Sequence, residues 1–512
     1  MLSEQGEAGQ VSMILPGPPL AADVSVDRRD CVTVMESMRL AWFSPLPPDR
    51  SGIATCCAEL LPLLARNHEI EAFVDDGRGR EVLDRTCPIP GVALRGAHDF
   101  PWRHATAPFD LAVYQLGNEL CHDYIWPYVV HYPGLVVLHD GQLHHARSAG
   151  LIRCGRLDDY RAEYAYSHPD APPALHEVVI AGMGDAVPSL YFEHPLVRVP
   201  VEAARLVAVH NQLLADELTE RIDGALVAAI RQGVNDLTAG LPGTSGRLRT
   251  QIGIPSDAVV FAAFGRATPE KRLVAVLTAL AQMRAAGGAG ENAWLLCVGA
   301  TTTYFDVRAL AARLGVEDRL VVTGYVPDEE LGRYLALADV GICLRWPTGR
   351  ETSASWLRCL AAGKPTFISG LAHLTSVPVI DPRTMDTLPV GDVAEEDRDP
   401  IGMIVELTDE VQMLRLGMRR LAEGAALRAR LGAAARRYWT RHATVELMAQ
   451  DYEALLRRAR NTEPRPHTQW PEHLLADGTG RARAIIGHMG AAADWLVPGL
   501  TSVDHLGPGH AG

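Results

Sequence analysis

The chain has 512 residues, which is too long for one compact core, so we expect two domains. Its 48 basic and 62 acidic residues leave a net charge of −14. That balance argues against a nucleic-acid partner, which would need many Lys and Arg contacts to phosphate. No run approaches the roughly 20 apolar residues that cross a bilayer, and the first thirty residues lack the pattern of a signal peptide. With nine scattered cysteines, these features predict a cytoplasmic protein with reduced thiols.

Apolar runs alternate with helical patterns along the first half of the chain. Residues 1–37 are rich in Pro and Gly, and we expect them to be poorly ordered. Residues 38–233 are predicted to form the N-terminal domain. Its apolar runs end in polar residues and are separated by helical patterns, which is typical of a parallel, Rossmann-like sheet. The predicted strands lie within 38–46, 68–76, 109–118, 134–140 and 204–211, and the predicted helices within 51–67 and 212–222.

The same pattern begins again after a stretch rich in Gly, Asn and Pro, so we place a hinge near residues 232–235. Residues 234–445 are predicted to form a second Rossmann-like domain. Residues 446–512 are predicted to be helices and a tail that return to the N-terminal domain. Two such sheets would face each other across a cleft at the carboxyl ends of their strands, where open α/β sheets bind ligands.

A strand is predicted within 257–267, and its apolar run ends at Gly265. Three cations follow that glycine: Arg266 directly after it, then Lys271 and Arg272. We expect the next helix to begin near Pro269, which would place Lys271 in its first turn beside free N–H groups. Cations are unfavourable at that end of a helix, so a bound diphosphate would explain them. The alternative is a solvated Lys-Arg pair on the helix surface.

A second polar cluster, Glu351, Thr352 and Ser353, precedes the helix predicted over 354–363. Ser and Thr at a helix start can cap it and leave N–H groups for an anion. A carboxylate there can accept hydrogen bonds from sugar hydroxyls. An ordinary N-cap with an acid in the first turn is the alternative interpretation.

The first domain offers polar residues at the ends of its strands as well. Ser51 and Gly52 lie in a loop whose backbone N–H groups could approach a phosphate or a sugar. Asn118 ends one predicted strand, and His139 with Asp140 ends the next. A His held against a carboxylate can orient a hydroxyl or assist proton movement, although a lone loop His is more often structural.

Together these clusters resemble the retaining glycosyltransferases of family 4, which have the GT-B fold. The resemblance spans about Arg39 to Arg458 and rests on "FSPLPPDRSGIA", "YQLGN", "VVLHD", "FGRATPEKR", "VTGYVPDEEL" and "RETSASWLRCLAAGKP". It implies transfer of a hexose from a UDP- or GDP-linked sugar to an acceptor hydroxyl, with retained configuration and without a metal or other cofactor. It also implies that residues 234–445 bind the nucleotide sugar and that residues 38–233 form the acceptor side. It assigns catalytic roles to His139, Arg266, Lys271 and Glu351. It assigns donor binding to Ser51, Gly52, Asn118, Asp140, Gly265, Tyr325, Val326, Thr352 and Ser353.

One position departs from the family pattern. Many members carry a second Glu where this chain has Arg358, and Glu351 lies one residue later than expected. This departure leaves a second carboxylate on the donor ribose in doubt. The pair Asp397 and Asp399 resembles a metal-binding D-x-D, but it does not follow an apolar strand, so we expect no metal there.

Several alternatives stay open at this point. Another GT-B enzyme, such as a nucleotide-sugar epimerase or a glycoside phosphorylase, has the same fold. A catalytically inert homologue that binds nucleotide sugar would also share these residues. The sequence does not identify the acceptor, the linkage, the oligomeric state or the role of residues 461–512. A lipid-linked acceptor would bring the chain to a membrane surface.

Overall fold

The computed structural model describes residues 36–75, 89–184, 187–241, 245–391, 393–466, 469–476 and 479–490. Residues 1–35 of the segment expected to be poorly ordered lie outside this range, as do residues 491–512 of the tail. Among the described helices, none combines the length and the apolar character needed to cross a membrane.

The first half of the chain forms a seven-stranded sheet in which every pairing is parallel. The strand order is β3-β2-β1-β4-β5-β6-β7. The central strands are buried on both faces, which explains their continuous apolar sequences. The strands are β1 (Arg39–Phe43), β2 (Glu69–Val74), β3 (Val92–Gly96), β4 (Leu111–Leu116), β5 (Leu135–Leu138), β6 (Leu206–Val209) and β7 (Val227–Ala229).

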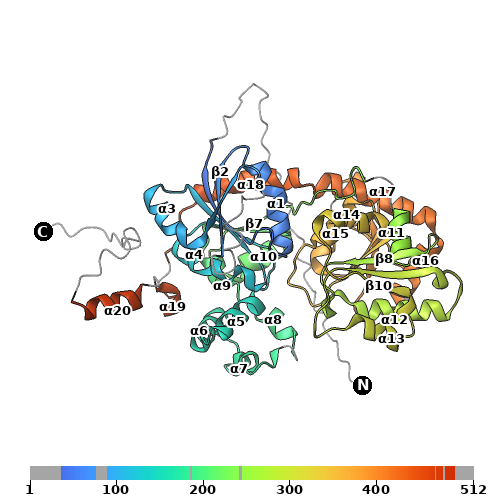
Figure 1. Ribbon diagram of the computed structural model, residues 1–512, viewed down its shortest axis with the longest axis horizontal. Coiled ribbons are helices and arrows are strands. Elements are labelled where there is room, and N and C mark those ends of the chain that lie inside the picture. Colours follow the sequence, from blue (N-terminus) through green and yellow to red (C-terminus); the bar gives the residue numbers. More distant parts are fainter. Residues whose placement is uncertain are drawn as a thin grey trace, which may run out of the picture. The chain divides into compact units, whose positions relative to one another are not determined.

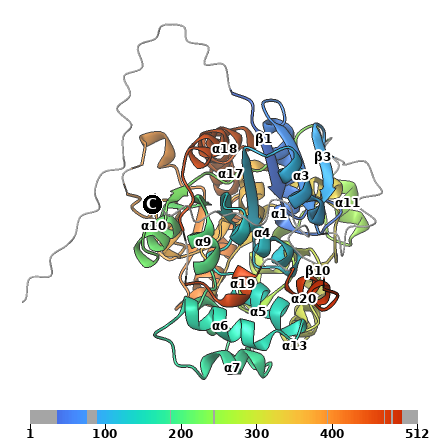
Figure 2. The ribbon, with the colours of Figure 1, turned by 90° about the vertical axis from the view of Figure 1, so that its left-hand side faces the viewer.

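Helices from both ends of the chain cover this sheet. On one face, α1 (Gly52–Leu64) lies along α18 (Val445–Arg460), and Leu60 and Met448 pack into one core with Trp42 (Figures 1 and 2). The other face is covered by α4 (Trp126–His131), α9 (Arg198–Ala203), α10 (Gln212–Arg221) and the short α19 (Glu472–Leu475). The C-terminal helices therefore complete the core around the first sheet.

Four short helices between β5 and β6 form a group beside this sheet, in the lower part of Figure 1. They are α5 (His144–Arg153), α6 (Leu157–Ser167), α7 (Leu175–Ile180) and α8 (Ser189–Glu193). They share a small core of their own that contains Leu151, Tyr160 and Tyr164. The buried guanidinium of Arg147 is held by Glu163 at 2.8 Å, which fastens α5 to α6.

The second half forms a six-stranded parallel sheet in the order β10-β9-β8-β11-β12-β13. Its strands are β8 (Val259–Phe264), β9 (Ala293–Val298), β10 (Leu320–Val322), β11 (Val340–Cys343), β12 (Thr366–Ser369) and β13 (Gly402–Val405). One face packs on α12 (Leu273–Ala285), α13 (Val307–Arg313) and α16 (Glu410–Glu423). The other packs on α11 (Ser245–Gln251), α14 (Asp328–Leu337) and α15 (Ala354–Ala361). The prediction of two parallel, Rossmann-like sheets is confirmed.

The chain crosses between the two sheets twice, and the crossings lie side by side. On the way out, the Val234 amide donates to the Ala443 carbonyl at 3.0 Å, where α17 (Ala425–His442) has just ended. A Cβ on Gly233 would lie 2.3 Å from the Thr444 carbonyl oxygen, so only glycine fits there. The two crossings are therefore packed against each other at backbone distance.

Candidate active site

A pocket of about 870 Å³ opens where the strand ends of the two sheets meet. Five of the sequence-predicted site residues line it: Ser51, Asn118 and Asp140 from the first half, and Arg266 and Glu351 from the second. Its charged lining is not basic. The carboxylates of Asp49, Glu119, Asp140, Glu270 and Glu351 face the guanidinium groups of Arg50, Arg266 and Arg345. Any anion that binds here must therefore compete with carboxylates for the arginines.

Arg266 reaches across the pocket mouth towards the first half. Its side chain is 54% exposed, and a terminal nitrogen lies 3.5 Å from Glu119 Oε1. Gly265 precedes it with φ of +87°, a conformation that L side chains rarely adopt. The glycine turn therefore aims Arg266 away from β8 and into the pocket.

Lys271 occupies a different place from the one predicted. The helix begins at Leu273, after a 3₁₀ turn over Pro269–Lys271 and a left-handed residue, Arg272, so Lys271 is not in an α-helical first turn. Its ammonium group is buried beneath Gly265 and donates to the Phe264 carbonyl. Burial, together with the smaller effect of the nearby Arg345 charge, lowers the pKa of Lys271 to about 8. Lys271 thus lies behind the pocket wall rather than in it.

The third cation of that cluster is taken up by a structural contact. The Arg272 Nε donates to Glu410 of α16 at 2.9 Å. The sequence interpretation counted Arg272 among the counter-charges for a diphosphate, and that interpretation was wrong. The partner lies 138 residues away in the chain, so no local pattern could have revealed it.

Glu351 is held by two neighbours before helix α15. Arg345 Nε lies 2.7 Å from its Oε1, and the Thr348 hydroxyl donates to its Oε2 at 2.9 Å. Its side chain is only 12% exposed, so these contacts replace water. Arg345 is a lining residue that the sequence interpretation missed.

Asp140 faces Glu351 from the opposite half. Burial raises the pKa of Asp140, and the charge of Glu351 raises it further, while Arg345 opposes the shift. The backbone N–H of Asn118 donates to Asp140 Oδ2 at 3.2 Å. The side-chain oxygen of Asn118, Oδ1, accepts from the backbone N–H of Ala146 in the first turn of α5 at 2.9 Å. Asn118 thus positions both Asp140 and the first turn of α5.

The loop before α1 contributes a capping residue and an arginine. Ser51 Oγ accepts from the Ile53 amide at 3.2 Å and caps α1. A Cβ added to Gly52 would meet nothing within 4 Å, so the space beside it is open. Arg50 lies over the ring of Tyr325 at 4.1 Å, which joins the two halves at the pocket rim. Neither Tyr325 nor Val326, which packs on the core of the second sheet, lines the pocket.

His139 is buried and does not line the pocket. Its Nε2 is 2.7 Å from Gln115 Oε1, and its ring packs on His210 at a centroid distance of 4.9 Å. Burial lowers the pKa of His139 well below its ordinary value, with His210 adding to the shift, so the ring is neutral. Gln115, at the end of β4, is a positioning residue that the sequence interpretation missed.

Thr352 and Ser353 are used in local contacts. The Thr352 hydroxyl donates to the His210 carbonyl at 3.1 Å, a contact between the halves. Ser353 Oγ accepts from the Trp356 amide at 3.3 Å and caps α15. Both lie outside the pocket lining, directly after Glu351.

Another part of the pocket wall comes from α5 and from α8 with its N-cap residue, for which the sequence interpretation predicted no elements. It presents Ala146, Ala149, Pro188, Tyr191 and Phe192. Small and aromatic side chains leave room for a ring and suit its apolar face. The short helices carry few apolar residues at regular spacing, so periodicity gave no signal for them.

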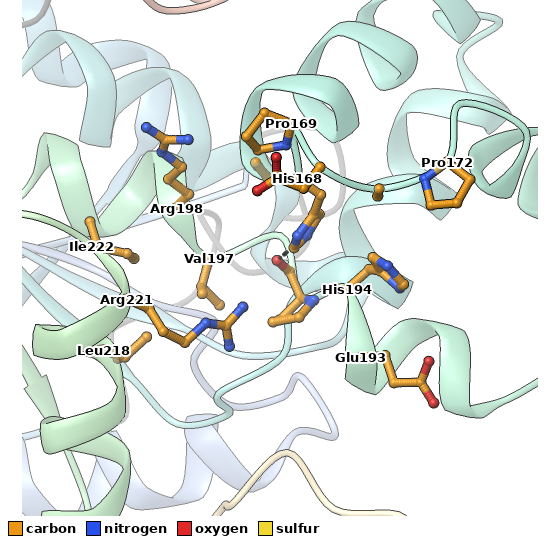
Figure 3. Close-up of a pocket in the computed structure, with 14 residues that line it drawn as sticks. His168, Pro169, Pro172, Glu193, His194, Val197, Arg198, Leu218, Arg221 and Ile222 are labelled. Atoms are coloured by element: carbon orange, nitrogen blue, oxygen red, sulfur yellow. Dashed lines mark hydrogen bonds between the residues drawn. The ribbon is translucent and has the colours of Figure 1, made fainter.

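A second hollow of about 510 Å³ is lined by residues 167–172 at and after the end of α6, by residues near 193–198 and by the end of α10 (Figure 3). His168 contacts the Pro195 carbonyl at 2.8 Å, and Arg221 points from α10 towards the loop that carries His194 and Val197. None of the sequence-predicted site residues lines this hollow.

Asp397 and Asp399, the two aspartates of the D-x-D sequence, each contact a basic side chain. Asp397 Oδ2 lies 2.8 Å from His442 Nε2, and Asp399 Oδ2 lies 2.6 Å from Arg437. Both partners belong to α17. Within the described residues, no group of three His, Cys, Asp or Glu side chains is arranged to hold a metal ion.

Comparisons with known proteins agree with this geometry. Residues 245–368 match the family model described as Glycosyl transferases group 1. A 2-deoxystreptamine glucosyltransferase of Streptomyces kanamyceticus is 27% identical over 244 residues, which are 45% of this chain. That match covers 60% of the relative's own length.

Two solved structures show the same fold at low identity. Sucrose-phosphate synthase from Thermosynechococcus elongatus has a TM-score of 0.54 at 16% identity, over 82% of this chain and 98% of that one. HepE from Anabaena, in complex with UDP and glucose, has a TM-score of 0.51 at 15% identity, over 82% of this chain and 99% of that one. Residues 245–368 thus match the model of the glycosyl transferases group 1, in a chain that has the GT-B fold.

Proposed function

We propose that this protein is a glycosyltransferase that moves a hexose from a nucleoside-diphosphate sugar to an acceptor hydroxyl, with retention of configuration and without a metal. One observation carries the proposal. A single pocket at the strand ends of both sheets brings together Asn118 and Asp140 from one half with Arg266 and Glu351 from the other. Pockets at this edge of parallel sheets are where ligands bind.

The pocket offers the chemistry that the transfer needs. The leaving diphosphate gains negative charge as the glycosidic bond breaks, and Arg266 provides a fixed cation for it. The buried ammonium of Lys271 adds positive charge from behind the Gly265 turn. The carboxylates of Asp140 and Glu351 suit the sugar, since they accept hydrogen bonds from hydroxyls. A phosphate oxygen takes the acceptor proton, so no protein nucleophile is required.

The acceptor belongs on the α5–α8 side. The aromatic faces of Tyr191 and Phe192, with the space left by Ala146 and Ala149, fit a ring. UDP is the first nucleotide to test, because the HepE structure holds UDP and glucose. The name of the Streptomyces relative makes 2-deoxystreptamine the first acceptor to include.

A donor screen followed by product analysis tests the proposal. UDP-, GDP- and ADP-linked hexoses are screened for a rise in melting temperature, since a ligand that binds only the folded state stabilises it. Release of nucleoside diphosphate is then measured with and without acceptors, with a chelator in parallel, and the anomeric configuration of the product is read by NMR.

Each rival function gives a different result in this assay. An inert binder gives the thermal shift without turnover. An epimerase converts the donor to another nucleotide sugar and releases no diphosphate. A phosphorylase requires inorganic phosphate. Loss of turnover in the chelator, or an inverted product, would contradict the metal-free retaining mechanism.

A further inference from the structure

Arg345 is a pocket arginine to which neither the sequence interpretation nor the family resemblance gives a role. It follows β11 at the carboxyl end of the second sheet, and its amide donates to the Ser369 hydroxyl at 2.9 Å. This bond fixes the chain where the strand ends. The Arg345 side chain then projects into the pocket, with 37% of its surface exposed.

Only one side of the Arg345 guanidinium is used. Its Nε lies 2.7 Å from Glu351 Oε1. Within the described part of the chain, its two terminal nitrogens donate no hydrogen bond to a protein group. The two terminal nitrogens of Arg345 are therefore available to bind two oxygens of a phosphate, whose geometry they match.

The other cations leave this role open. Lys271 is buried with its ammonium turned to the Phe264 carbonyl, and Arg272 is bound to Glu410. On the second-sheet side of the pocket, the guanidinium groups that face the open space are those of Arg266 and Arg345.

We propose that Arg345 is a donor-binding residue whose ion pair with Glu351 opens when a nucleoside diphosphate binds. The terminal N–H groups of Arg345 then contact the diphosphate, and the Glu351 carboxylate becomes free to accept hydrogen bonds from the sugar. The inference rests on the proposed function and adds a residue and an exchange of partners to it.

The exchange is favourable for a physical reason. A diphosphate carries more negative charge than a carboxylate and can accept both terminal nitrogens at once. Glu351 keeps the hydrogen bond from Thr348 after Arg345 leaves, so its carboxylate is not left without a partner. Before a diphosphate binds, the same ion pair balances the charge of the half-buried Glu351 carboxylate.

Three variants test the exchange: Arg345→Gln, Glu351→Gln and the control Arg161→Gln. Arg161 is 37% exposed and lies 2.7 Å from Glu177, so it matches Arg345 in exposure and ion-pair distance, but it lies outside the pocket. Calorimetry measures the binding of UDP, GDP and ADP and of the matching nucleosides, which lack phosphate.

For the nucleotide that binds the wild type, we expect Arg345→Gln to weaken the diphosphate about 10- to 100-fold, as for the loss of a charged hydrogen bond, and to leave the nucleoside unchanged. Glu351→Gln should tighten the diphosphate, because it removes the competitor for Arg345. Arg161→Gln should bind as the wild type does.

The decisive result is that the two variants change diphosphate affinity in opposite directions. If the ion pair were merely structural, Arg345→Gln and Glu351→Gln would both weaken binding. Equal weakening by both variants, or wild-type affinity in Arg345→Gln, overturns the inference while the proposed function stands. A wild type that binds none of the three diphosphates overturns both. If Arg345→Gln does not fold, Arg345→Lys keeps the charge but loses the fork, and we expect intermediate affinity.

Discussion

Glu59 and Arg358 form an enclosed ion pair between the two halves of the chain. Glu59 Oε1 on α1 lies 2.9 Å from a terminal nitrogen of Arg358 on α15, and the two side chains are only 11% and 8% exposed. The other carboxylate oxygen of Glu59 accepts from the Asn235 amide at 3.3 Å, at the crossing between the sheets. The position where the family pattern has a second Glu therefore fastens α15 to α1 here, outside the pocket lining.

We expect Arg358→Met to lower the free energy of unfolding by about 3–5 kcal/mol, because it leaves the Glu59 charge buried without its partner. The double variant Glu59→Gln/Arg358→Met should lose less than the sum of the two single changes. Thermal and urea unfolding measure both effects.

The exposed pair Arg419–Glu423 is the matched control. Its side chains are 56% and 55% exposed, so Arg419→Met should cost only about 0–1 kcal/mol. Strictly additive losses at Glu59 and Arg358 would show that the two side chains are not coupled.

Lys271→Met should change how stability depends on pH. The pKa of Lys271 falls from 10.5 to about 8 in the folded chain, so between these values the unfolded chain holds more protons. Stability from this group therefore rises as the pH increases from about 8 to about 10.5. Over that pH range, the free energy of unfolding measured in urea should rise for the wild type relative to the variant. A constant difference between the two curves would contradict the buried position of the ammonium.

Asp140→Asn should stabilise the fold at pH 8 while it lowers turnover. The pKa of Asp140 is raised from 3.8 to about 7, so the folded chain binds its proton more tightly than the unfolded chain does. The contribution of this group to stability is then lost as the pH rises through that window. Melting temperatures should coincide below pH 4 and separate above pH 7. A variant that melts lower at pH 8 would refute this assignment.

Ala149→Phe should raise the KM for the acceptor and leave nucleoside diphosphate binding unchanged, because the new ring fills the α5 wall of the pocket. Steady-state kinetics and calorimetry separate the two effects. Ala162→Phe, on an exposed position of α6 outside the pocket, controls for the cost of a Phe in a helix. Weaker diphosphate binding in Ala149→Phe would place this wall on the donor side instead.

The sequence predicted those parts of the fold that depend on local hydrophobic patterning. β1, β4, β5 and β8 are continuous apolar runs because both of their faces are buried, and each was predicted. β3 and β7 were missed, because they are edge strands whose side chains are only partly buried and whose sequences are weakly apolar.

The orientation of site residues depends on distant partners, which a local pattern does not contain. Arg272 follows Lys271 in sequence, yet Glu410 turns it away from the pocket. Arg358 binds a carboxylate 299 residues earlier in the chain. Arg345 follows β11 and Gln115 lies near the end of β4, but only their contacts with Glu351 and His139 distinguish them from ordinary residues at strand ends.

The packing of α18 on the first sheet bears on how the chain matures during synthesis. Tyr452 and Leu456 of that helix close the face that holds Trp42 and Val113, more than three hundred residues after β4 has left the ribosome. Until then the nascent chain must carry an uncovered apolar surface, the kind that chaperones bind and that aggregates when they do not. A fragment that stops after the first crossing would keep that surface for good, so expression trials of the first half should append residues 445–460 through a linker.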